Sequence, residues 1–104
     1  MAGRLDAKQI ALDFVNACIK RGIPIKAAIL FGSYAKGSAT SYSDIDLALI
    51  SDSFGKNIIV NSRQTALLNY QFPDIEVHHL SPEEFQEDIP IINEIKKTGI
   101  KIWG

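Results

Sequence analysis

Residues 32–46 read Gly-Ser-Tyr-Ala-Lys-Gly-Ser-Ala-Thr-Ser-Tyr-Ser-Asp-Ile-Asp, and the other predicted elements are arranged around this stretch. An apolar run at residues 27–31 leads into it, and a second apolar run at residues 47–50 follows it. Two apolar runs that flank a segment rich in glycine, serine and threonine predict a strand, a tight turn, a loop and a second strand.

Four residues of this stretch suit a site for phosphate and metal. Gly32 lets backbone approach a ligand closely, because it has no side chain. Ser33 offers a hydroxyl and a backbone N–H to a phosphate oxygen. Asp44 and Asp46 are two apart on the expected strand, so their carboxylates should point to one face, where they repel unless a cation lies between them. Mg²⁺ prefers such carboxylates together with substrate phosphates.

The order Gly32-Ser33, a spacer of ten residues and the pair Asp44-x-Asp46 resembles the signature of the nucleotidyltransferase (polymerase beta-like) superfamily. The spacer is similar to that of its minimal nucleotidyltransferase (MNT) subgroup, small single domains often paired with HEPN-domain proteins. The resemblance implies a nucleotidyltransferase fold in which a short helix after the turn holds the nucleotide's phosphates. It places Lys36 near a phosphate; the alternative is a solvated surface lysine. The alternative for the motif is a solvated loop before a strand with two surface aspartates.

The length and composition of the chain limit the number of domains, the classes of partner and the kinds of cysteine site that are possible. At 104 residues the chain is expected to form one domain, residues 1–104, with a modest core. The formal net charge of −1 gives no strong signal for nucleic acid. The single Cys18 excludes an internal disulfide and a cysteine-rich zinc site, and packing is its expected role. No signal-peptide or membrane-spanning pattern is found, so a cytoplasmic protein without a membrane partner is expected.

The remaining patterns predict a mixed α/β (α+β) fold, a small mixed sheet flanked by helices. Helical and strand periods alternate along the chain. Expected helices cover residues 5–21 and 57–71, a start near 81–84, and a segment from Pro90 to about Lys97; expected strands cover 25–31, 45–50, 74–80 and 100–103. The inner face of the helix at 57–71 is expected to carry mainly apolar residues, namely Ile58, Ile59, Ser62, Ala66, Leu67 and Tyr70. Tyr34 and Tyr42 are expected to pack where the loop meets the strands; the alternative is that either ring stacks on the nucleobase of the bound nucleotide.

A third acid is expected from the strand at residues 74–80, where the family resemblance places a carboxylate beside the aspartate pair. Glu76 matches that position best, and Asp74, two residues earlier on the same face, is the rival. His78 and His79 face opposite sides of a strand and cannot easily share one ion. His79 is expected to be a satisfied, partly buried histidine, and His78 an outer group near the site or simply exposed.

The resemblance implies two Mg²⁺ ions about 3.5–4 Å apart, bridged by Asp44 and Asp46. Glu76 would bind the second ion or take the proton of the attacking hydroxyl. The implied reaction transfers AMP from ATP to an acceptor and releases pyrophosphate. So short a chain must take further contacts from a partner or a second copy of itself, and the resemblance implies a HEPN-type helical protein, on which the chain would act as an antitoxin. The alternative is a non-catalytic module that neutralises or scaffolds this partner by contact. Transfer to a small molecule is less expected without an added substrate domain.

Overall fold

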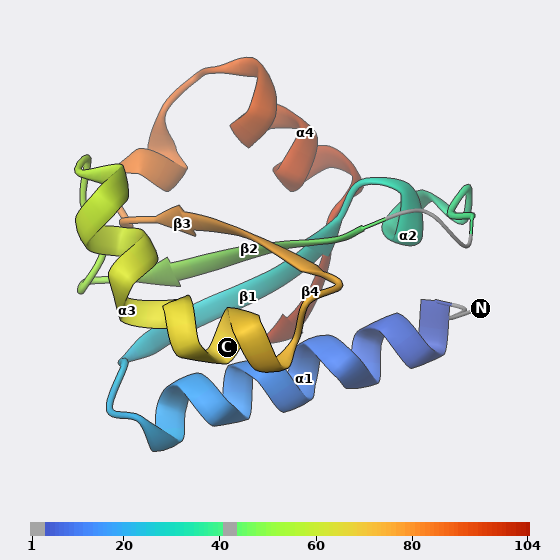
Figure 1. Ribbon diagram of the computed structural model, residues 1–104. Helices are drawn as coiled ribbons and strands as arrows, with labels where there is room; N and C mark the ends of the chain where they lie inside the picture. The colour runs from blue at the N-terminus through green and yellow to red at the C-terminus, as the bar shows by residue number, and fades with distance from the viewer. Residues whose placement is uncertain (1–3, 41–43) are drawn as a thin grey trace.

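The computed structural model describes residues 4–40 and 44–104, and its centre is a four-stranded sheet in the order β3-β2-β1-β4 (Figure 1). Its elements in chain order are α1 (Arg4–Lys20), β1 (Ile25–Phe31), α2 (Ser33–Lys36), β2 (Ile45–Ser51), α3 (Ile58–Gln71), β3 (Ile75–Leu80), the 3₁₀ helix η1 (Glu84–Gln86), α4 (Pro90–Thr98) and β4 (Ile100–Trp103). The expected α/β class is confirmed, and most predicted boundaries agree to within one residue.

The sheet is mixed, as expected. β1 runs antiparallel to both β2 and β4, whereas β2 and β3 are parallel. Parallel neighbours need a long crossover, and α3 supplies it. The register pairs Asp46 of β2 with Phe31 of β1 on one side and with Glu76 of β3 on the other. The end of β1, the start of β2 and the start of β3 therefore meet at one end of the sheet.

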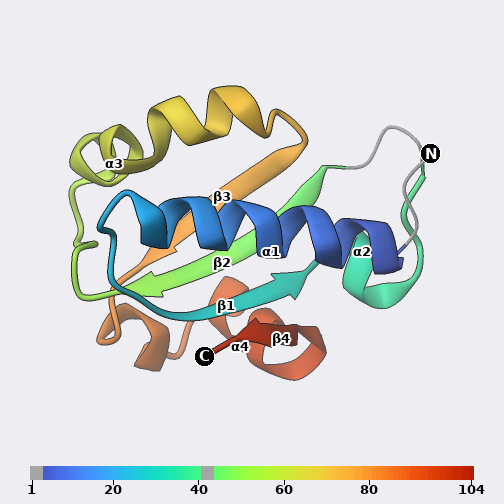
Figure 2. The same cartoon turned by 90° about the horizontal axis from the view of Figure 1, so that it is seen from below.

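Helices cover both faces of the sheet, which explains why β1 and β2 are apolar on both sides. α1 and α3 lie on one face and α4 on the other (Figures 1 and 2). The larger core, between the sheet and α1, includes Phe14, Leu30, Ile45, Leu47 and Leu49. The smaller core, beneath α4, consists of Ile29, Phe31, Ala48, Ile50, Ile92 and Ile95.

Cys18 lies on the buried stripe of α1, so its predicted packing role is confirmed. Its side chain is fully buried, and this burial raises the pKa of the thiol to about 11. Because a thiolate is the reactive form of cysteine, Cys18 is unsuited to nucleophilic chemistry.

The predicted inner face of α3 is wrong. The buried residues are Asn61, Thr65 and Leu68, whereas the helix exposes its larger apolar side chains, Ile58, Ile59, Val60, Leu67 and Tyr70. The inward polar groups are used: the Asn61 side chain accepts a hydrogen bond from the Gly55 N–H at 2.9 Å and donates one to the Gly55 carbonyl at 2.6 Å. The helix begins one residue later than expected, because the Asn57 side chain caps the N–H groups of the first turn.

The helix expected near residues 81–84 is only the single turn η1. Its start signal forms as predicted: the Glu84 N–H donates to Ser81 Oγ, and the Ser81 N–H donates to Glu84 Oε1. Glu87 already has extended backbone, and Pro90 favours an extended residue before it, so too few residues remain for a longer helix.

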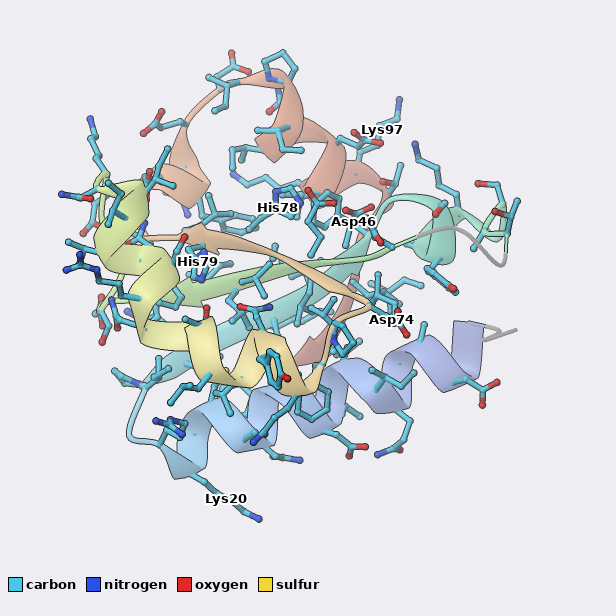
Figure 3. All side chains as sticks on the ribbon, viewed as in Figure 1. Lys20, Asp46, Asp74, His78, His79 and Lys97 are labelled. Carbon is cyan, nitrogen blue, oxygen red and sulfur yellow. The ribbon has the colours of Figure 1, made fainter. Side chains whose placement is uncertain are left out.

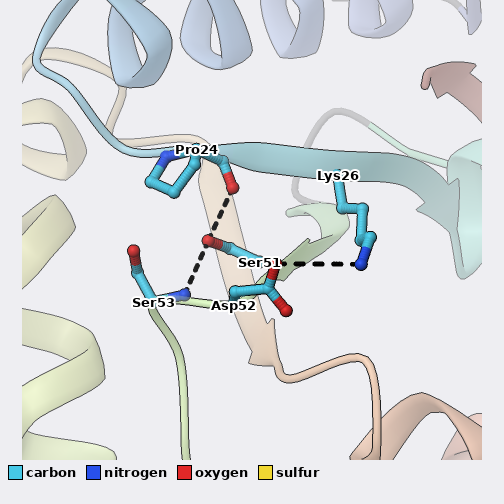
Figure 4. A network of polar contacts seen from close by, with 5 residues as sticks. All are labelled: Pro24, Lys26, Ser51, Asp52 and Ser53. Atoms are coloured by element: carbon cyan, nitrogen blue, oxygen red, sulfur yellow. Dashed lines mark hydrogen bonds and ion pairs between the residues drawn. The ribbon is translucent and has the colours of Figure 1, made fainter.

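A polar network closes the opposite end of β2 (Figure 4). The buried Ser51 hydroxyl donates to the Pro24 carbonyl at 2.7 Å and accepts from the Ser53 N–H at 3.1 Å. Lys26 and Asp52 form an exposed ion pair at 3.7 Å beside it. This network ties the start of β1 to the turn after β2, leaving the other end of the strands for the motif. Across the part of the chain described, none of the helices is long and apolar enough to span a membrane.

Candidate active site

Three side chains that can bind a metal ion gather on the face of the sheet that α4 covers. Asp46 and Glu76 are paired across β2 and β3, and residues paired in neighbouring strands point to the same face. His78 follows Glu76 by two residues, so it shares that face. In Figure 3 the His78 and Asp46 side chains lie side by side above the strands, whereas His79 points toward α3.

The three side chains are close enough to share one ion. One ligand atom from each of Asp46, Glu76 and His78 lies within 4.8 Å of the others. Nε2 of His78 is 3.5 Å from Oδ1 of Asp46, and the two side chains are 30% and 25% exposed. The His78 ring packs edge-on against Phe31, with ring centres 4.9 Å apart. Its Nε2 atom is buried and has no hydrogen-bond partner in residues 4–40 and 44–104.

Gly32 follows Phe31 and lies directly against the Asp46 carboxylate. Its backbone has φ 73° and ψ −150°, a region that is essentially restricted to glycine. A Cβ atom built there would overlap Oδ2 of Asp46 and lie 3.1 Å from its Cγ. The sequence predicts Gly32 as a place where backbone approaches a ligand, and the structure shows that the close neighbour is the Asp46 side chain.

Replacing Gly32 with alanine should therefore damage both the fold and the site. We expect Gly32→Ala to lower the free energy of unfolding by about 1–3 kcal/mol through backbone strain, and to displace the Asp46 carboxylate. Gly22→Ala is the matched control, because Gly22 also has positive φ but has no described atom within 4 Å of a built Cβ. Stability should be measured by urea denaturation for both variants, and the affinity of the site for a divalent cation should be measured with Mn²⁺ as the probe ion. Equal Mn²⁺ affinity in the two variants would contradict this account.

The rest of the predicted nucleotide-binding segment forms α2. Ser33 is its first residue, and Lys36 lies in its last turn. Lys36 Nζ is 2.6 Å from Oε1 of Glu94 in α4, and both side chains are partly exposed, so the lysine has an internal partner that a phosphate would have to replace. Tyr34 is buried in the core, as expected for packing at the base of the loop. Tyr42 lies outside the described residues.

The two remaining acids considered from the sequence lie apart from the cluster. β2 begins at Ile45, so Asp44 precedes the strand and is exposed. Asp74 likewise precedes β3 and is exposed; its backbone carbonyl accepts a hydrogen bond from the Ile45 N–H at 2.8 Å. Within residues 4–40 and 44–104, the cluster that is close enough to hold a metal ion contains Asp46 and Glu76 but neither of these two carboxylates. The register thus brings Glu76, rather than Asp74, beside Asp46.

His79 behaves as the sequence predicts. Its Nε2 is 2.8 Å from the buried Thr65 hydroxyl, and its ring packs edge-on against Phe54. Burial, with a smaller contribution from His78, lowers the pKa of His79 from 6.5 to about 4. His79 is therefore neutral in the folded protein near pH 7 and faces away from the acidic cluster.

This lowered pKa makes folding stability depend on pH. The unfolded chain takes up a proton on His79 below pH 6.5, whereas the folded chain does so only near pH 4. The contribution of neutral His79 to the free energy of unfolding is therefore fully present above pH 6.5, and it is lost as the pH drops from 6.5 to 4. Allowing for partial solvent screening, we expect a loss of about 1–2 kcal/mol. Urea denaturation in EDTA at several pH values checks this, with His79→Gln as the comparison. An equally steep pH dependence in that variant would contradict it.

The sequence pattern only partly revealed the part played by His78. Its two-residue spacing from Glu76 places it on the polar face, but an exposed or outer position was equally compatible with that pattern. The missing information is the set of contacts made by the imidazole: its ring packs against Phe31, and its buried Nε2 atom lies 3.5 Å from Oδ1 of Asp46. Those contacts depend on the β1–β2–β3 register, which no local pattern encodes.

Comparison with known proteins gives a family and two curated relatives. The family model described as "Polymerase beta, Nucleotidyltransferase" matches residues 15–104. "Putative protein adenylyltransferase MJ1305" of Methanocaldococcus jannaschii is 42% identical over 48 residues, covering 45% of this chain and 33% of that protein. "Probable protein adenylyltransferase MntA" of Haemophilus influenzae is 41% identical over 49 residues, covering 47% and 43%. The chain thus spans less than half the length of these two relatives.

Solved structures share the fold. A crystal structure described as a putative nucleotidyltransferase from Sulfolobus solfataricus superposes with a TM-score of 0.71 at 16% identity, over 96% of this chain and 82% of that one. The MNT antitoxin complex with a tri-AMPylated Shewanella oneidensis HEPN toxin gives a TM-score of 0.57 at 19% identity, over 97% and 72%. At these identities the likeness establishes the architecture alone.

Proposed function

The chain belongs to the polymerase beta nucleotidyltransferase family, and on that basis we propose that it transfers AMP from ATP to an acceptor hydroxyl group. In this reaction the acceptor oxygen forms a bond to the α-phosphorus of ATP. The bond from that phosphorus to the bridging oxygen breaks, and pyrophosphate leaves. The acceptor proton passes to a base in the site. The family membership rests on the match over residues 15–104.

The observation that carries the proposal is the pairing of Asp46 with Glu76 across neighbouring strands at the mouth of the Gly32-Ser33 turn. Two carboxylates placed this close repel each other. This repulsion destabilises the fold, so a purely structural role does not explain the pair, whereas a cation bound between the two groups does. The adjacent buried Nε2 of His78 also lacks a partner among the described residues. The set fits a divalent cation, for which Mg²⁺ is the ion that the family resemblance implies.

The proposal gives the site residues three roles: holding the cation, accepting the proton and binding the phosphates. Asp46 and Glu76 would hold the cation, and Asp44, exposed just before β2, would join when nucleotide phosphates arrive. The cation, when bound, neutralises phosphate charge and lowers the pKa of the attacking hydroxyl. Glu76 would orient this hydroxyl and accept its proton. Gly32 and Ser33 would bind the phosphates, and Lys36 would contact them after leaving Glu94.

We propose a HEPN-type helical protein as the acceptor and partner, with this chain as the antitoxin. The names of the two curated relatives describe protein adenylyltransferases, and one of the similar structures is a complex of an MNT antitoxin with an AMPylated HEPN toxin. The exposed apolar side chains of α3, among them Tyr70 at 88% and Ile58 at 77% exposure, support a protein partner, because such groups mark interaction surfaces.

The test is to incubate the chain with ATP, Mg²⁺ and a candidate HEPN partner, and to detect AMP on the partner by mass spectrometry. AMP addition that requires both ATP and the divalent cation is the expected result. Replacing ATP in turn by GTP, CTP and UTP identifies the nucleotide. Stable binding of the partner without any AMP transfer would overturn the proposal in favour of a non-catalytic binding module.

A further inference from the structure

We propose that His78 is a direct ligand of the metal ion in this site, and that its imidazole makes the site prefer Mn²⁺ to Mg²⁺. The inference rests on the proposed function only in that both place a divalent cation at Asp46 and Glu76. It adds a nitrogen ligand to the carboxylate set, and with it a different order of metal preference.

The first argument is the position of Nε2. At 3.5 Å from Oδ1 of Asp46 it is too far for a well-formed N–H···O hydrogen bond, which spans about 2.7–3.2 Å. With metal–ligand bonds of about 2.1 Å, two ligands of one ion lie about 3.0–3.4 Å apart. The separation of the two atoms is therefore closer to that of two ligands of a shared ion than to that of a hydrogen-bonded pair.

The second argument is the unmet polar group. Nε2 of His78 is buried, and none of the described residues accepts from it or donates to it. A buried polar atom without a partner destabilises the fold, because it has lost its hydrogen bonds to water. If the imidazole proton is on Nδ1, the Nε2 lone pair is available to an ion held by Asp46 and Glu76. A bound ion would thus supply the missing partner.

The third argument is that the imidazole is held in place. Phe31 packs edge-on against the His78 ring, and the parallel pairing of β2 with β3 places His78 beside Ala48, the residue two after Asp46. Strand-borne ligands with restricted rotamers lose little entropy when an ion binds.

The choice of metal follows from the donor atoms. Mg²⁺ favours oxygen ligands in octahedral geometry, and nitrogen contributes little to its binding. Mn²⁺ accepts carboxylates as Mg²⁺ does, and as a first-row transition ion it also binds imidazole. Two carboxylates and one imidazole therefore favour Mn²⁺, and the preference should be lost when the imidazole is removed.

The experiment uses the full chain, freed of metal with EDTA and titrated with Mn²⁺ alone. Loss of the free-ion signal in electron paramagnetic resonance gives the affinity, and pulsed resonance detects ¹⁴N bonded to the bound ion. Wild type is compared with His78→Gln and with His79→Gln, which removes the neighbouring imidazole from the opposite face. Circular dichroism confirms that each variant is folded. Mg²⁺ affinity is obtained by competition with Mn²⁺.

We expect ¹⁴N coupling in wild type and in His79→Gln, and its loss in His78→Gln with Mn²⁺ affinity lowered at least about tenfold and Mg²⁺ affinity nearly unchanged. Bound Mn²⁺ without ¹⁴N coupling, or coupling that persists in His78→Gln, would overturn the inference and leave the proposed function intact. A wild-type chain that binds no Mn²⁺ would also overturn it, and only that result counts against the metal site of the proposed function.

Discussion

Asp46→Asn should reduce AMP transfer to a small residual rate while leaving the fold intact. The substitution keeps the size of the side chain but removes the charge at the centre of the metal-sized cluster. Loss of about 4 kcal/mol of metal-derived stabilisation of the transition state would lower the rate by roughly 10³-fold. Because Asp46 and Glu76 no longer repel each other, thermal stability without metal should rise slightly. The measurements are the AMP-transfer rate at saturating Mg²⁺ and the melting temperature in EDTA.

Asp52→Asn is the matched control for this experiment. Asp52 follows the opposite end of the same strand, where it forms an exposed ion pair with Lys26. Asp52→Asn removes the same charge, but far from the cluster, so it is expected to keep the wild-type transfer rate. The fold should also be kept, since exposed ion pairs contribute about 0–1 kcal/mol to stability. Asp44→Asn belongs in the same series and is expected to lose transfer. Wild-type activity in Asp46→Asn would show that the cluster is not the metal site.

The strands around the motif could be predicted because each depends on a local pattern. The two apolar runs that flank residues 32–46 became β1 and β2, and the alternation of residues 74–80 became β3. These signals reflect burial on one or both faces of a strand, which the chain encodes within a few residues. The resemblance carried by the motif then led to the right fold and family.

The missed features depend on contacts between distant segments. The inward face of α3 carries Asn61 and Thr65 because the Gly55 loop and His79 need hydrogen-bond partners there. Apolar periodicity alone selects the opposite face. In the same way, the sequence leaves Glu76 and Asp74 as rivals, since only the β2–β3 register shows which carboxylate lies beside Asp46.

That register leads to the last prediction, which separates the two acids. Glu76→Gln keeps the size and hydrogen-bonding capacity of the side chain but removes the charge that a proton acceptor needs. We expect turnover to fall by roughly 10²–10⁴, the range for loss of a positioned base. Nucleotide affinity should change little, because Gly32, Ser33 and Asp46 remain.

The comparison variant is Asp74→Asn. The Asp74 side chain is exposed and lies outside the cluster, and the contribution of this residue to the site is its backbone carbonyl, which accepts from Ile45 and survives the substitution. Near-normal turnover is therefore expected. Calorimetric ATP affinity and the AMP-transfer rate should be measured in parallel for both variants. If Asp74→Asn loses turnover and Glu76→Gln does not, Asp74 and not Glu76 is the functional acid, and the inference from the β2–β3 register is wrong. If both keep turnover, the base does not come from β3, and the acceptor protein is the place to look for it.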